Sequence, residues 1–553
     1  MKNHFFLFSL LTVFTSYSQN FHWAKSLCGS SFSEAIADVC SNSEGTIYLT
    51  GTYAGVVDFD PGPGVYNNSP NQSGAFVLAL DSYGNFKWVS LFNGDVQPSS
   101  IKTDNSGNIL VSGFFNGNGQ FDPGVNVYSF SSTVKNAFVA KLSGLGNIIW
   151  VKKDGYNSQT SWSSELIVDE MNNIYNLGTY QGVLTLPTGS NMVSNGFYNT
   201  YLAKRDSNGD FLWAKSYGGP GLMSSSHLQK GTANELYFTG SYSNTVDFDP
   251  GPATVNQTSN GYRDIYVMKV DTSGDFIWAK TFGSSLEEME FELAVDSQSN
   301  VYLATNVYDS LDIDPSPTLT HMVYNQGNAD ICLLKLSGSG NFIWSKTIAS
   351  PSFEYVNGLT LNNQQDILMV GDFSGTLDFD PGSAIYNVTT GVSFLEKLDK
   401  DGNFIWVKTI DGIGLASFAT VCSGDYNDLV VTGPFNSTFD FDTGSSIANL
   451  SSCGMEDVFI LKFGEGLTGI RENKKQIPSK IYPNPSNGYY TVELEQTPLN
   501  YNMEIKDISG RILFLQEIDK ENNNINLMNY PSGLYFATLK YNGQTKTVKV
   551  IKE

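Results

Sequence analysis

The sequence is poor in cysteine, histidine and basic residues. Five cysteines among 553 residues are too few for a disulfide-rich scaffold. The four histidines form no H-E-x-x-H pattern, which argues against a zinc protease, and there is no G-x-S-x-G to supply an α/β-hydrolase nucleophile. The 32 basic residues face 55 acidic ones, so the net charge of −23 argues against nucleic acid as a partner.

Long apolar runs are also missing. Residues 5–14 form an apolar run, but a bilayer span takes about 20 apolar residues, so we predict no transmembrane segment. This run follows a single charge, Lys2, and precedes Ser16 and Ser18 at the spacing of a signal-peptidase site. We therefore predict a signal peptide over residues 1–18 and an exported protein. No cysteine follows the cleavage point to carry a lipid anchor.

The acidic charge is concentrated in one part of the chain. Residues 20–469 hold 20 basic and 46 acidic side chains, whereas residues 470–553 hold 11 and 9. A field of this sign repels anionic membranes and attracts cations. Solubility outside the cell is the simpler explanation of the same charge.

Tryptophan marks a repeat of 62 to 66 residues. Seven of the eight tryptophans follow one another at this spacing, and Trp162 is out of phase. A fixed period of this length indicates one supersecondary unit used many times. The repeating residues are Trp23, Trp88, Trp150, Trp213, Trp278, Trp344 and Trp406.

Each repeat contains four short segments with the composition of β-strands. After Trp278 they read FELAVDSQ, NVYLATNVY, DICLLKLS and NFIWSKTI, rich in aromatic and β-branched residues and bounded by turn residues. No segment has a sustained helical period. Four antiparallel strands per repeat, used many times, predict an all-β fold of the β-propeller type.

The ends of the chain set the phase of the repeat. Seven first strands begin near Ala35, Ser99, Glu165, His227, Phe291, Val356 and Phe418. After the last of these the chain supplies two further strands and no tryptophan strand, but FHWAKSL at residues 21–27 has the missing pattern. We therefore predict a seven-bladed β-propeller over residues 19–464, closed by its N-terminal strand, which removes an unpaired sheet edge.

The cysteines allow two disulfides in an exported protein. Cys28 with Cys40, and Cys422 with Cys453, could each pair because both partners fall within one repeat. Cys332 lies in the apolar run DICLLKL and is expected to be buried.

The motifs VDTSGDFIWAKTFG and LAVDSQSNVYLAT resemble the bacterial β-propeller repeats known as SBBP repeats. The resemblance covers residues 20–464. It implies a propeller of the kind found in secreted bacterial proteins, and it implies no particular reaction, because a shared scaffold is not a shared site.

The C-terminal part differs from the repeats in composition and pattern. Residues 465–477 read as a polar linker, and the alternating runs of residues 478–553 predict a small antiparallel β-sandwich. The motifs YPNPSNG, DISGRIL, PSGLYFATL and KTVKVIKE resemble the type A sorting domain of the type IX secretion system of Bacteroidetes. That resemblance implies the secretion machinery as a partner, passage across the outer membrane, removal of the module, and release or attachment at the surface.

An acidic motif, D-F-D-P-G and its variants, recurs between the second and third strands of the repeats. A D-x-D pair places two carboxylates on one side of an extended chain, and calcium prefers such oxygen ligands. The alternative is that the middle residue fills the core while the aspartates face water or cap the turn. The candidate calcium ligands are Asp58, Asp60, Asp247, Asp249, Asp312, Asp314, Asp378, Asp380, Asp440 and Asp442.

The turns before four of the tryptophan strands resemble the Asp-box of sialidases, but aspartate stands three residues before glycine instead of two. We interpret these residues as turn caps that accept backbone N–H groups. They are Asp81, Asp206, Asp271 and Asp399.

Together these features predict a secreted or cell-surface propeller that is not an enzyme. We expect a binding or adhesion role with a glycan or a surface protein as partner, and no cofactor other than calcium. The alternative is a glycan-active hydrolase or lyase that uses carboxylates of the loops.

Overall fold

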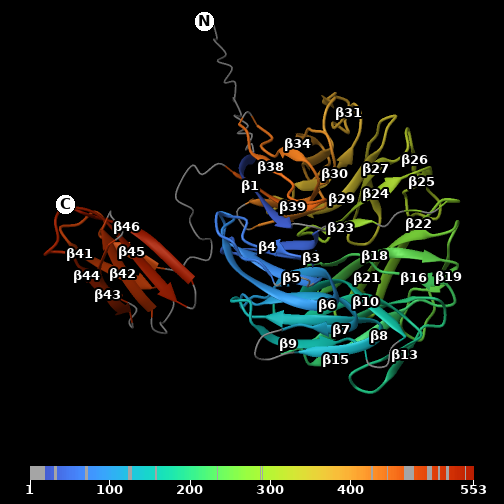
Figure 1. Ribbon diagram of the computed structural model, residues 1–553, viewed down its shortest axis with the longest axis horizontal. Coiled ribbons are helices and arrows are strands. Elements are labelled where there is room, and N and C mark those ends of the chain that lie inside the picture. Colours follow the sequence, from blue (N-terminus) through green and yellow to red (C-terminus); the bar gives the residue numbers. More distant parts are fainter. Residues whose placement is uncertain are drawn as a thin grey trace, which may run out of the picture. The chain divides into compact units, whose positions relative to one another are not determined.

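The computed structural model shows an all-β protein (Figure 1). It divides into two compact units, Met1–Glu465 and Gly466–Glu553. The described residues are 19–29, 34–68, 73–122, 128–155, 159–232, 234–286, 288, 291–424, 427–444, 446–465, 479–494, 501–507, 511–518, 522–541 and 544–553. The predicted signal peptide and all but the first residue of the predicted linker lie outside them.

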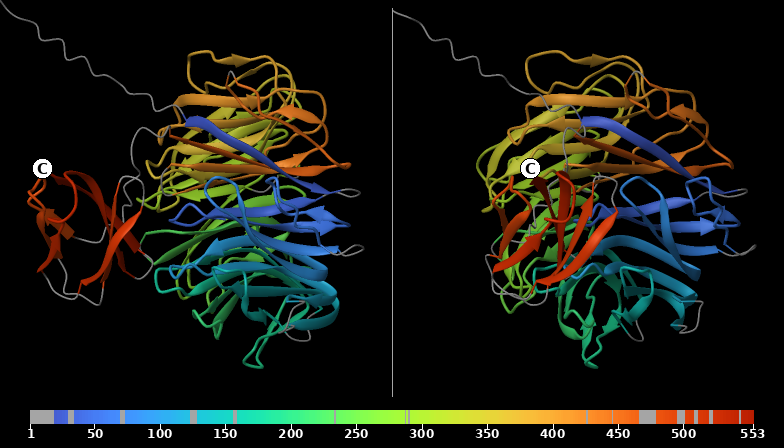
Figure 2. Two further views of the ribbon diagram at one scale, coloured as in Figure 1. Left: turned by 60° about the vertical axis from the view of Figure 1, so that its left-hand side comes forward. Right: turned by 90° about the vertical axis from the view of Figure 1, so that its left-hand side faces the viewer.

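The first unit is built from antiparallel four-stranded arrays, consistent with propeller blades, whose strands pair in chain order (Figures 1 and 2). The first two arrays share one long strand and so form a continuous sheet. They comprise β2 (Ala35–Ser41), β3 (Ile47–Ala54), β5 (Ser73–Leu80), β6 (Phe86–Thr103), β7 (Ile109–Gln120), β8 (Ser129–Leu142) and β9 (Ile148–Lys153).

The next arrays are separate sheets. The third array comprises β10 (Thr160–Val168), β11 (Ile174–Gln181), β14 (Asn199–Arg205) and β15 (Phe211–Tyr217). In the fourth, β16 (Leu222–Met223) and β17 (Leu228–Lys230) both pair with β18 (Glu235–Ser243), which is followed by β21 (Asp264–Asp271) and β22 (Phe276–Phe282). The fifth comprises β23 (Glu292–Val295), β24 (Val301–Val307), β27 (Asp330–Leu336) and β28 (Phe342–Ile348), and the sixth comprises β29 (Glu354–Leu361), β30 (Ile367–Phe373), β33 (Ser393–Leu398) and β34 (Phe404–Ile410).

The last array combines the two ends of the unit. Its strands are β35 (Thr420–Ser423), β36 (Leu429–Phe435), β39 (Asp457–Glu465) and β1 (Gln19–Gly29). Strand β1 pairs antiparallel with β39, with Ala24 opposite Leu461 and Leu27 opposite Val458. This is the pairing that the FHWAKSL segment predicts.

Burial differs between the inner and outer strands of an array. The second and third strands, such as β24 and β27, are buried along almost their whole length, because neighbouring arrays cover both of their faces. The fourth strand, such as β28, is mostly half-buried, with one exposed residue, Ile343, and one buried residue, Ile348. Its tryptophan packs against a turn glycine of the following array; for example, a Cβ on Gly146 would lie 2.5 Å from the Trp88 ring. The tryptophan period is therefore a period of contacts between arrays.

The connections between second and third strands form short hairpins, which we call ribbons. Their strands are β4 (Val57–Asp58), β12 (Val183–Thr185) with β13 (Asn191–Val193), β19 (Thr245–Asp247) with β20 (Asn256–Thr258), β25 (Ser310–Asp312) with β26 (Met322–Tyr324), β31 (Leu377–Asp378) with β32 (Asn387–Val388), and β37 (Thr438–Asp440) with β38 (Asn449–Ser451).

The second unit contains two antiparallel sheets around one apolar core that includes Tyr490, Val492, Ile505 and Leu539. One sheet comprises β40 (Ser479–Tyr482), β41 (Tyr489–Leu494) and β44 (Asn522–Asn526). The other comprises β43 (Ile512–Ile518), β42 (Tyr501–Asp507), β45 (Gly533–Tyr541) and β46 (Gln544–Lys552). This is the β-sandwich that the alternating pattern predicts.

Candidate functional site

The aspartates of the ribbons bind backbone amides. In the first ribbon, Asp58 Oδ1 accepts hydrogen bonds from the N–H groups of Asp60 at 3.0 Å and Tyr66 at 2.8 Å. Asp60 Oδ1 in turn accepts from the Gly62 N–H at 2.8 Å. The two carboxylates therefore hold the hairpin shut and cap its turn.

The same bonds recur in the other ribbons of the D-x-D type. The first aspartate accepts from the second and from a residue eight or nine positions further on, and the second aspartate accepts from the residue two positions further on. These aspartates are Asp247 and Asp249, Asp312 and Asp314, Asp378 and Asp380, and Asp440 and Asp442.

The residue between the two aspartates belongs to the core. Phe59, Phe248, Ile313, Phe379 and Phe441 are fully buried. The capping alternative for the D-x-D motif is thus confirmed for these side chains. Calcium binding stays a prediction; among the described residues, the ten aspartates do not assemble into a group of three acidic, histidine or cysteine ligands.

The turn aspartates behave in the same way. Asp81 Oδ1 accepts from the N–H groups of Tyr83 at 2.8 Å and Asn85 at 2.9 Å, and Asp206, Asp271 and Asp399 make the equivalent bonds. The interpretation of these residues as turn caps is confirmed.

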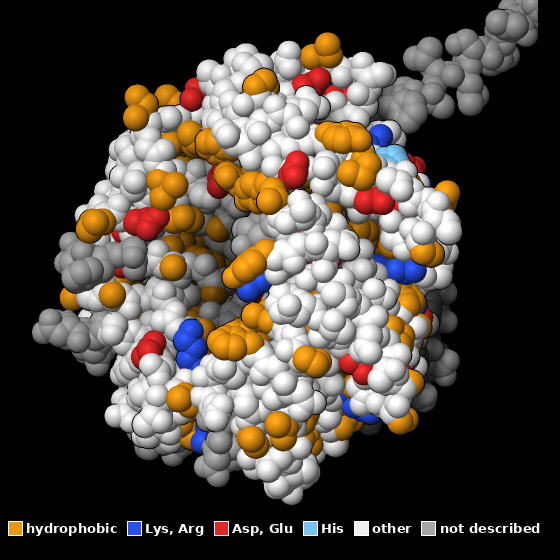
Figure 3. Space-filling view, turned by 90° about the vertical axis from the view of Figure 1, so that its right-hand side faces the viewer, with side chains coloured by type: hydrophobic (Ala, Val, Ile, Leu, Met, Phe, Trp, Pro, Cys, Tyr) orange, Lys and Arg blue, Asp and Glu red, His pale blue; other side chains and the backbone are white. Residues whose placement is uncertain are grey.

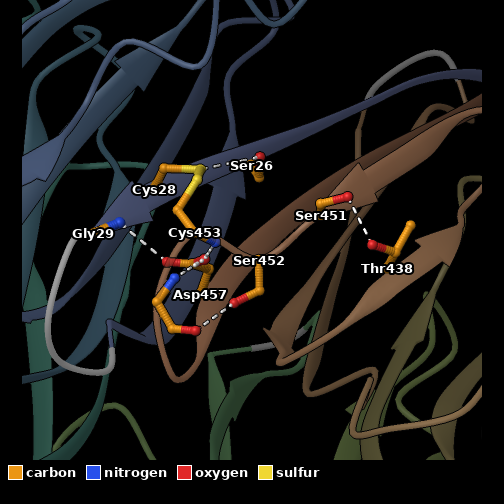
Figure 4. Close-up of a disulfide and its surroundings, with 9 residues drawn as sticks. Ser26, Cys28, Gly29, Thr438, Ser451, Ser452, Cys453 and Asp457 are labelled. Atoms are coloured by element: carbon orange, nitrogen blue, oxygen red, sulfur yellow. Dashed lines mark hydrogen bonds between the residues drawn. A yellow bond between two sulfur atoms is a disulfide. The ribbon is translucent and has the colours of Figure 1, made fainter.

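The disulfide differs from both predicted pairs. Cys28 is bonded to Cys453, with 5.5 Å between their Cα atoms, while Cys40 and Cys422 are free (Figure 4). The pairing of Cys28 with Cys40 and of Cys422 with Cys453 is therefore wrong. The physical reason is the placement of β1: this strand lies beside β39, so its last residues meet the connection that leads into β39. Cys332 is buried, as expected.

A chain of charged residues joins the first strands of consecutive arrays. Lys102 Nζ lies 2.8 Å from Asp38 Oδ2 and 3.3 Å from Glu165 Oε1. His227 continues the chain, with Nδ1 3.6 Å from Glu165 Oε2 and Nε2 3.4 Å from Glu292 Oε1. Burial lowers the pKa of His227, but Glu292 and Glu165 outweigh it and hold that pKa well above its usual range.

Sequence patterns do not reveal this chain, because its residues share no type or motif. Their common signal is position: each comes from a first strand or its immediate start, near the points that the repeat phase predicts. The alternation of acid and base, Asp, Lys, Glu, His, Glu, compensates charge that would otherwise be buried unpaired. We interpret the chain as a link between arrays.

The two ends of the arrays differ in their exposed apolar side chains. In an antiparallel array the ribbons and the connections to the next array leave from one end, which we call the ribbon end, and the tight turns occupy the other, the turn end. At the turn end, the exposed large hydrophobic residues among the described ones are Tyr83, Leu145 and Met171 in the tight turns, and Ile149, Leu212, Ile277, Ile343 and Ile405 at the start of fourth strands. The exposed large hydrophobic residues of the ribbons and of the connections, which we call the ribbon-end residues, are Val65, Tyr66, Val193, Phe197, Tyr262, Leu286, Tyr308, Leu319, Tyr324, Ile385, Tyr386, Ile413, Leu415, Ile447 and Met455. The rings of Tyr66 and Tyr386 lie against Phe86 and Phe404, the first residues of fourth strands.

Contiguous exposed apolar patches are typical of interaction surfaces. Figure 3 shows one side of the molecule, on which hydrophobic side chains gather around a hollow. Six of the ribbon-end residues are aromatic, and aromatic side chains are enriched where proteins bind partners. Among the described residues, no helix has the length and hydropathy needed to cross a membrane.

Comparison with solved structures finds distant similarities. PorZ, an essential bacterial surface component of the type IX secretion system of Porphyromonas gingivalis, is 10% identical with a TM-score of 0.19, over 96% of this chain and 100% of that one. A protein of unknown function from Bacteroides thetaiotaomicron is 12% identical with a TM-score of 0.27, over 80% of this chain and 97% of the other.

Curated proteins and family models also show similarities. An uncharacterized WD repeat-containing protein of Acanthamoeba polyphaga mimivirus is 22% identical over 439 residues, 65% of this chain; the chain spans 31% of that relative's length. Residues 480–553 match the family described as the secretion system C-terminal sorting domain. The predicted sorting domain is thus confirmed, and the protein is exported by the type IX system to the cell surface or beyond.

Proposed function

We propose that the first unit is a seven-bladed β-propeller, closed by its N-terminal strand, that binds a glycan through its ribbon end and has no catalytic activity. The observation that carries the proposal is the difference between the two ends of the arrays. Six exposed aromatic side chains belong to the ribbons and connections, whereas among the described residues Tyr83 is the one exposed aromatic side chain of the tight turns.

Closure is supported by contacts that repeat around the unit. Each first strand lies next to the first strand of the following array, and β35 lies next to β2. Lys269 Nζ and Trp278 Nε1 both donate to the Gly338 carbonyl of the next array, at 2.9 and 3.2 Å. Lys462 and Trp23 of the last array make the same pair of bonds to Ser82 of the first, at 3.0 and 3.3 Å.

A glycan is the partner that fits the chemistry of the ribbon end. Flat aromatic rings with one polar edge can stack on the C–H faces of a sugar while their hydroxyl groups bind its oxygens. Tyr262 and Tyr324 expose 74% and 66% of their surface. The acidic field of the propeller disfavours anionic partners, so we expect a neutral or basic glycan.

Absence of catalysis is supported by the repetition itself. A glycosidase needs an acid and a base in different environments, whereas the ribbon aspartates occur as near-copies that all accept backbone amides. After export we expect the sorting domain to be removed, and the propeller to be released or attached at the surface.

A glycan array probed with the full chain tests the proposal. We expect binding that Tyr262→Ala and Tyr324→Ala weaken at least tenfold each, while Tyr83→Ala at the turn end leaves it unchanged. Equal losses in all three variants would contradict the role of the ribbon end. Hydrolysis of any polysaccharide, lost on single replacement of a ribbon aspartate, would contradict the absence of catalysis.

A further inference from the structure

A short motif recurs at three of the connections between arrays. It reads GSSFSE at residues 29–34, GSSLEE at 283–288 and ASPSFE at 349–354. Each motif ends in a glutamate that comes before or at the first strand of an array. In the structure each of these glutamates meets an aspartate that begins the third strand of the preceding array.

The pair between β27 and β29 shows the geometry. Asp330 and Glu354 are both fully buried. Asp330 Oδ2 accepts the Gln326 N–H at 2.5 Å, and Glu354 accepts the Ser350 N–H at 3.1 Å and the Ser350 hydroxyl at 2.5 Å. Each carboxyl group thus caps its own loop, and the Glu354 N–H donates to the carbonyl of Ala329, the neighbour of Asp330, at 2.8 Å. Among the described residues, the charged group that faces Asp330 is Glu354, and the charged group that faces Glu354 is Asp330.

The second pair is Asp264 with Glu288. Asp264 Oδ2 accepts the Asn260 N–H at 2.9 Å and the Tyr242 hydroxyl at 3.4 Å. Glu288 Oε1 accepts the Ser284 N–H at 2.8 Å, and its carboxyl group is repelled by Asp264.

The third pair, Glu34 with Asp457, lies beside the disulfide. Asp457 accepts the Gly29 N–H at 3.0 Å and also the Cys453 N–H (Figure 4). Glu34 is 1% exposed, and its carboxyl group lies beside Gly29, where an added Cβ would be 2.0 Å from Glu34 Oε1. The disulfide beside this pair does not titrate.

All three pairs contain buried oxygens that no other group satisfies. Among the described residues, Asp330 Oδ1, Glu288 Oε2 and both carboxyl oxygens of Glu34 receive no hydrogen bond from a protein donor. A buried carboxylate oxygen without a donor is costly, and a neighbouring carboxylate that is ionised can only accept hydrogen bonds. The donor that is missing from each pair is a proton on one of its two carboxyl groups.

We propose that Glu34 with Asp457, Glu288 with Asp264, and Glu354 with Asp330 each hold one proton at neutral pH. These three contacts between neighbouring arrays then weaken as the pH rises. The position of the three contacts shows which part of the fold a rise in pH affects. They lie where third strands begin and connections end, which is the ribbon end, so loss of the protons loosens the loops of that end.

The pKa shifts agree with this assignment. Burial first, and then the charge of Asp457, raises the pKa of Glu34 to about 8. Burial also raises the pKa of Glu354 to about 7, with Asp330 adding to the shift. The pKa values of Asp330, Asp264 and Glu288 are raised as well, mainly by burial.

The sign of the pH effect follows from these shifts. In the unfolded chain a glutamate loses its proton near pH 4.5, whereas in the folded protein it keeps the proton up to about pH 7 or 8. The stabilisation is therefore complete below about pH 4.5 and is lost progressively as the pH rises to those values. The pairs of Glu34 and Glu354 each change the folding equilibrium constant by about tenfold per pH unit within this window.

The test compares the melting temperature of the full chain between pH 5 and pH 8.5 with that of Glu34→Gln, Glu354→Gln and the double variant. Glutamine keeps the size of the side chain and supplies a donor that does not titrate. We expect the melting temperature of the parent protein to fall as the pH rises, and the double variant to fall less steeply. Glu44→Gln, at an exposed position, serves as the matched control and should keep the parent slope.

Three results would overturn the proposal. The first is a melting temperature that does not change with pH in the parent protein, and the second is an unchanged slope in the double variant. The third is a rise in the melting temperature of the parent protein at pH 8 on addition of millimolar calcium, with no such rise in the double variant. That result would show that the carboxyl pairs bind a cation instead of a proton. If the glutamine variants do not fold, Asp330→Asn provides the same comparison, and an infrared band of protonated carboxyl groups at pH 7 tests the parent protein directly.

Discussion

The turn end and the ribbon end of the arrays use the same side chain for different purposes. At the turn end, Asp81 and its equivalents close tight turns of nearly constant length, and glycines beside them receive the tryptophans of the preceding array. At the ribbon end, Asp58 and its equivalents close longer hairpins whose tips differ from repeat to repeat. One end thus repeats the contacts that hold the arrays together, and the other end varies its surface.

The largest effect is expected from the disulfide at the ribbon end. Replacing both Cys28 and Cys453 by serine removes the covalent link between β1 and the connection that leads into β39. We expect a loss of about 2–5 kcal/mol in the free energy of unfolding, measured by denaturant titration. A reductant should lower the stability of the parent protein in the same way and leave the double variant unchanged; an effect of reductant on the variant would contradict this assignment.

The next largest effect is expected at the turn end. In Gly146→Ala the new Cβ would lie 2.5 Å from the Trp88 ring, at a residue with φ of 83°. Overpacking and backbone strain together should cost about 2–4 kcal/mol, measured by thermal or denaturant unfolding.

Gly107→Ala is the matched control for this change. Gly107 has φ of 78°, and a methyl group added there would meet no atom within 4 Å among the described residues beyond its chain neighbours. This variant should therefore cost only the strain, about 1 kcal/mol. Equal costs in the two variants would show that the contact between tryptophan and glycine contributes nothing.

The smallest effect should be equal at the two ends. Asp58→Ala and Asp81→Ala each remove a carboxylate that accepts two backbone N–H groups. We expect each to cost about 1–2 kcal/mol, and Asp58→Asn to recover most of the loss because the amide oxygen still accepts. Millimolar calcium should leave the melting temperature unchanged; a rise that Asp58→Asn abolishes would favour the calcium prediction instead.

Most of the architecture follows from local sequence signals. The tryptophan period, the alternation within FELAVDSQ and its equivalents, and the Asp-Gly turns all report on short-range structure, and FHWAKSL identifies the partner of β39 because one strand is missing there. The sorting domain is equally readable, since YPNPSNG and PSGLYFATL combine turn residues and strands in a fixed order.

Contacts between residues far apart in the sequence are harder to predict. The pairing of Cys28 with Cys453 agrees with the predicted place of β1, but the repeat phase by itself favours cysteine partners within one repeat. The chain from Asp38 to Glu292 and the paired carboxyl groups depend on side chains that meet across arrays, far apart in the sequence. A single chain shows no pattern that distinguishes such acids from exposed ones.

The pairing of β1 with β39 sets an order of events during synthesis and folding. Strand β1 is made first, yet the disulfide that fastens it spans 425 residues. Contacts of such sequence separation form late, because closing a long loop costs entropy that a local hairpin avoids. The unit that carries the export signal begins only after Glu465. A chain cut short before β39 therefore lacks both the partner of its own first strand and the sorting domain that the type IX system recognises.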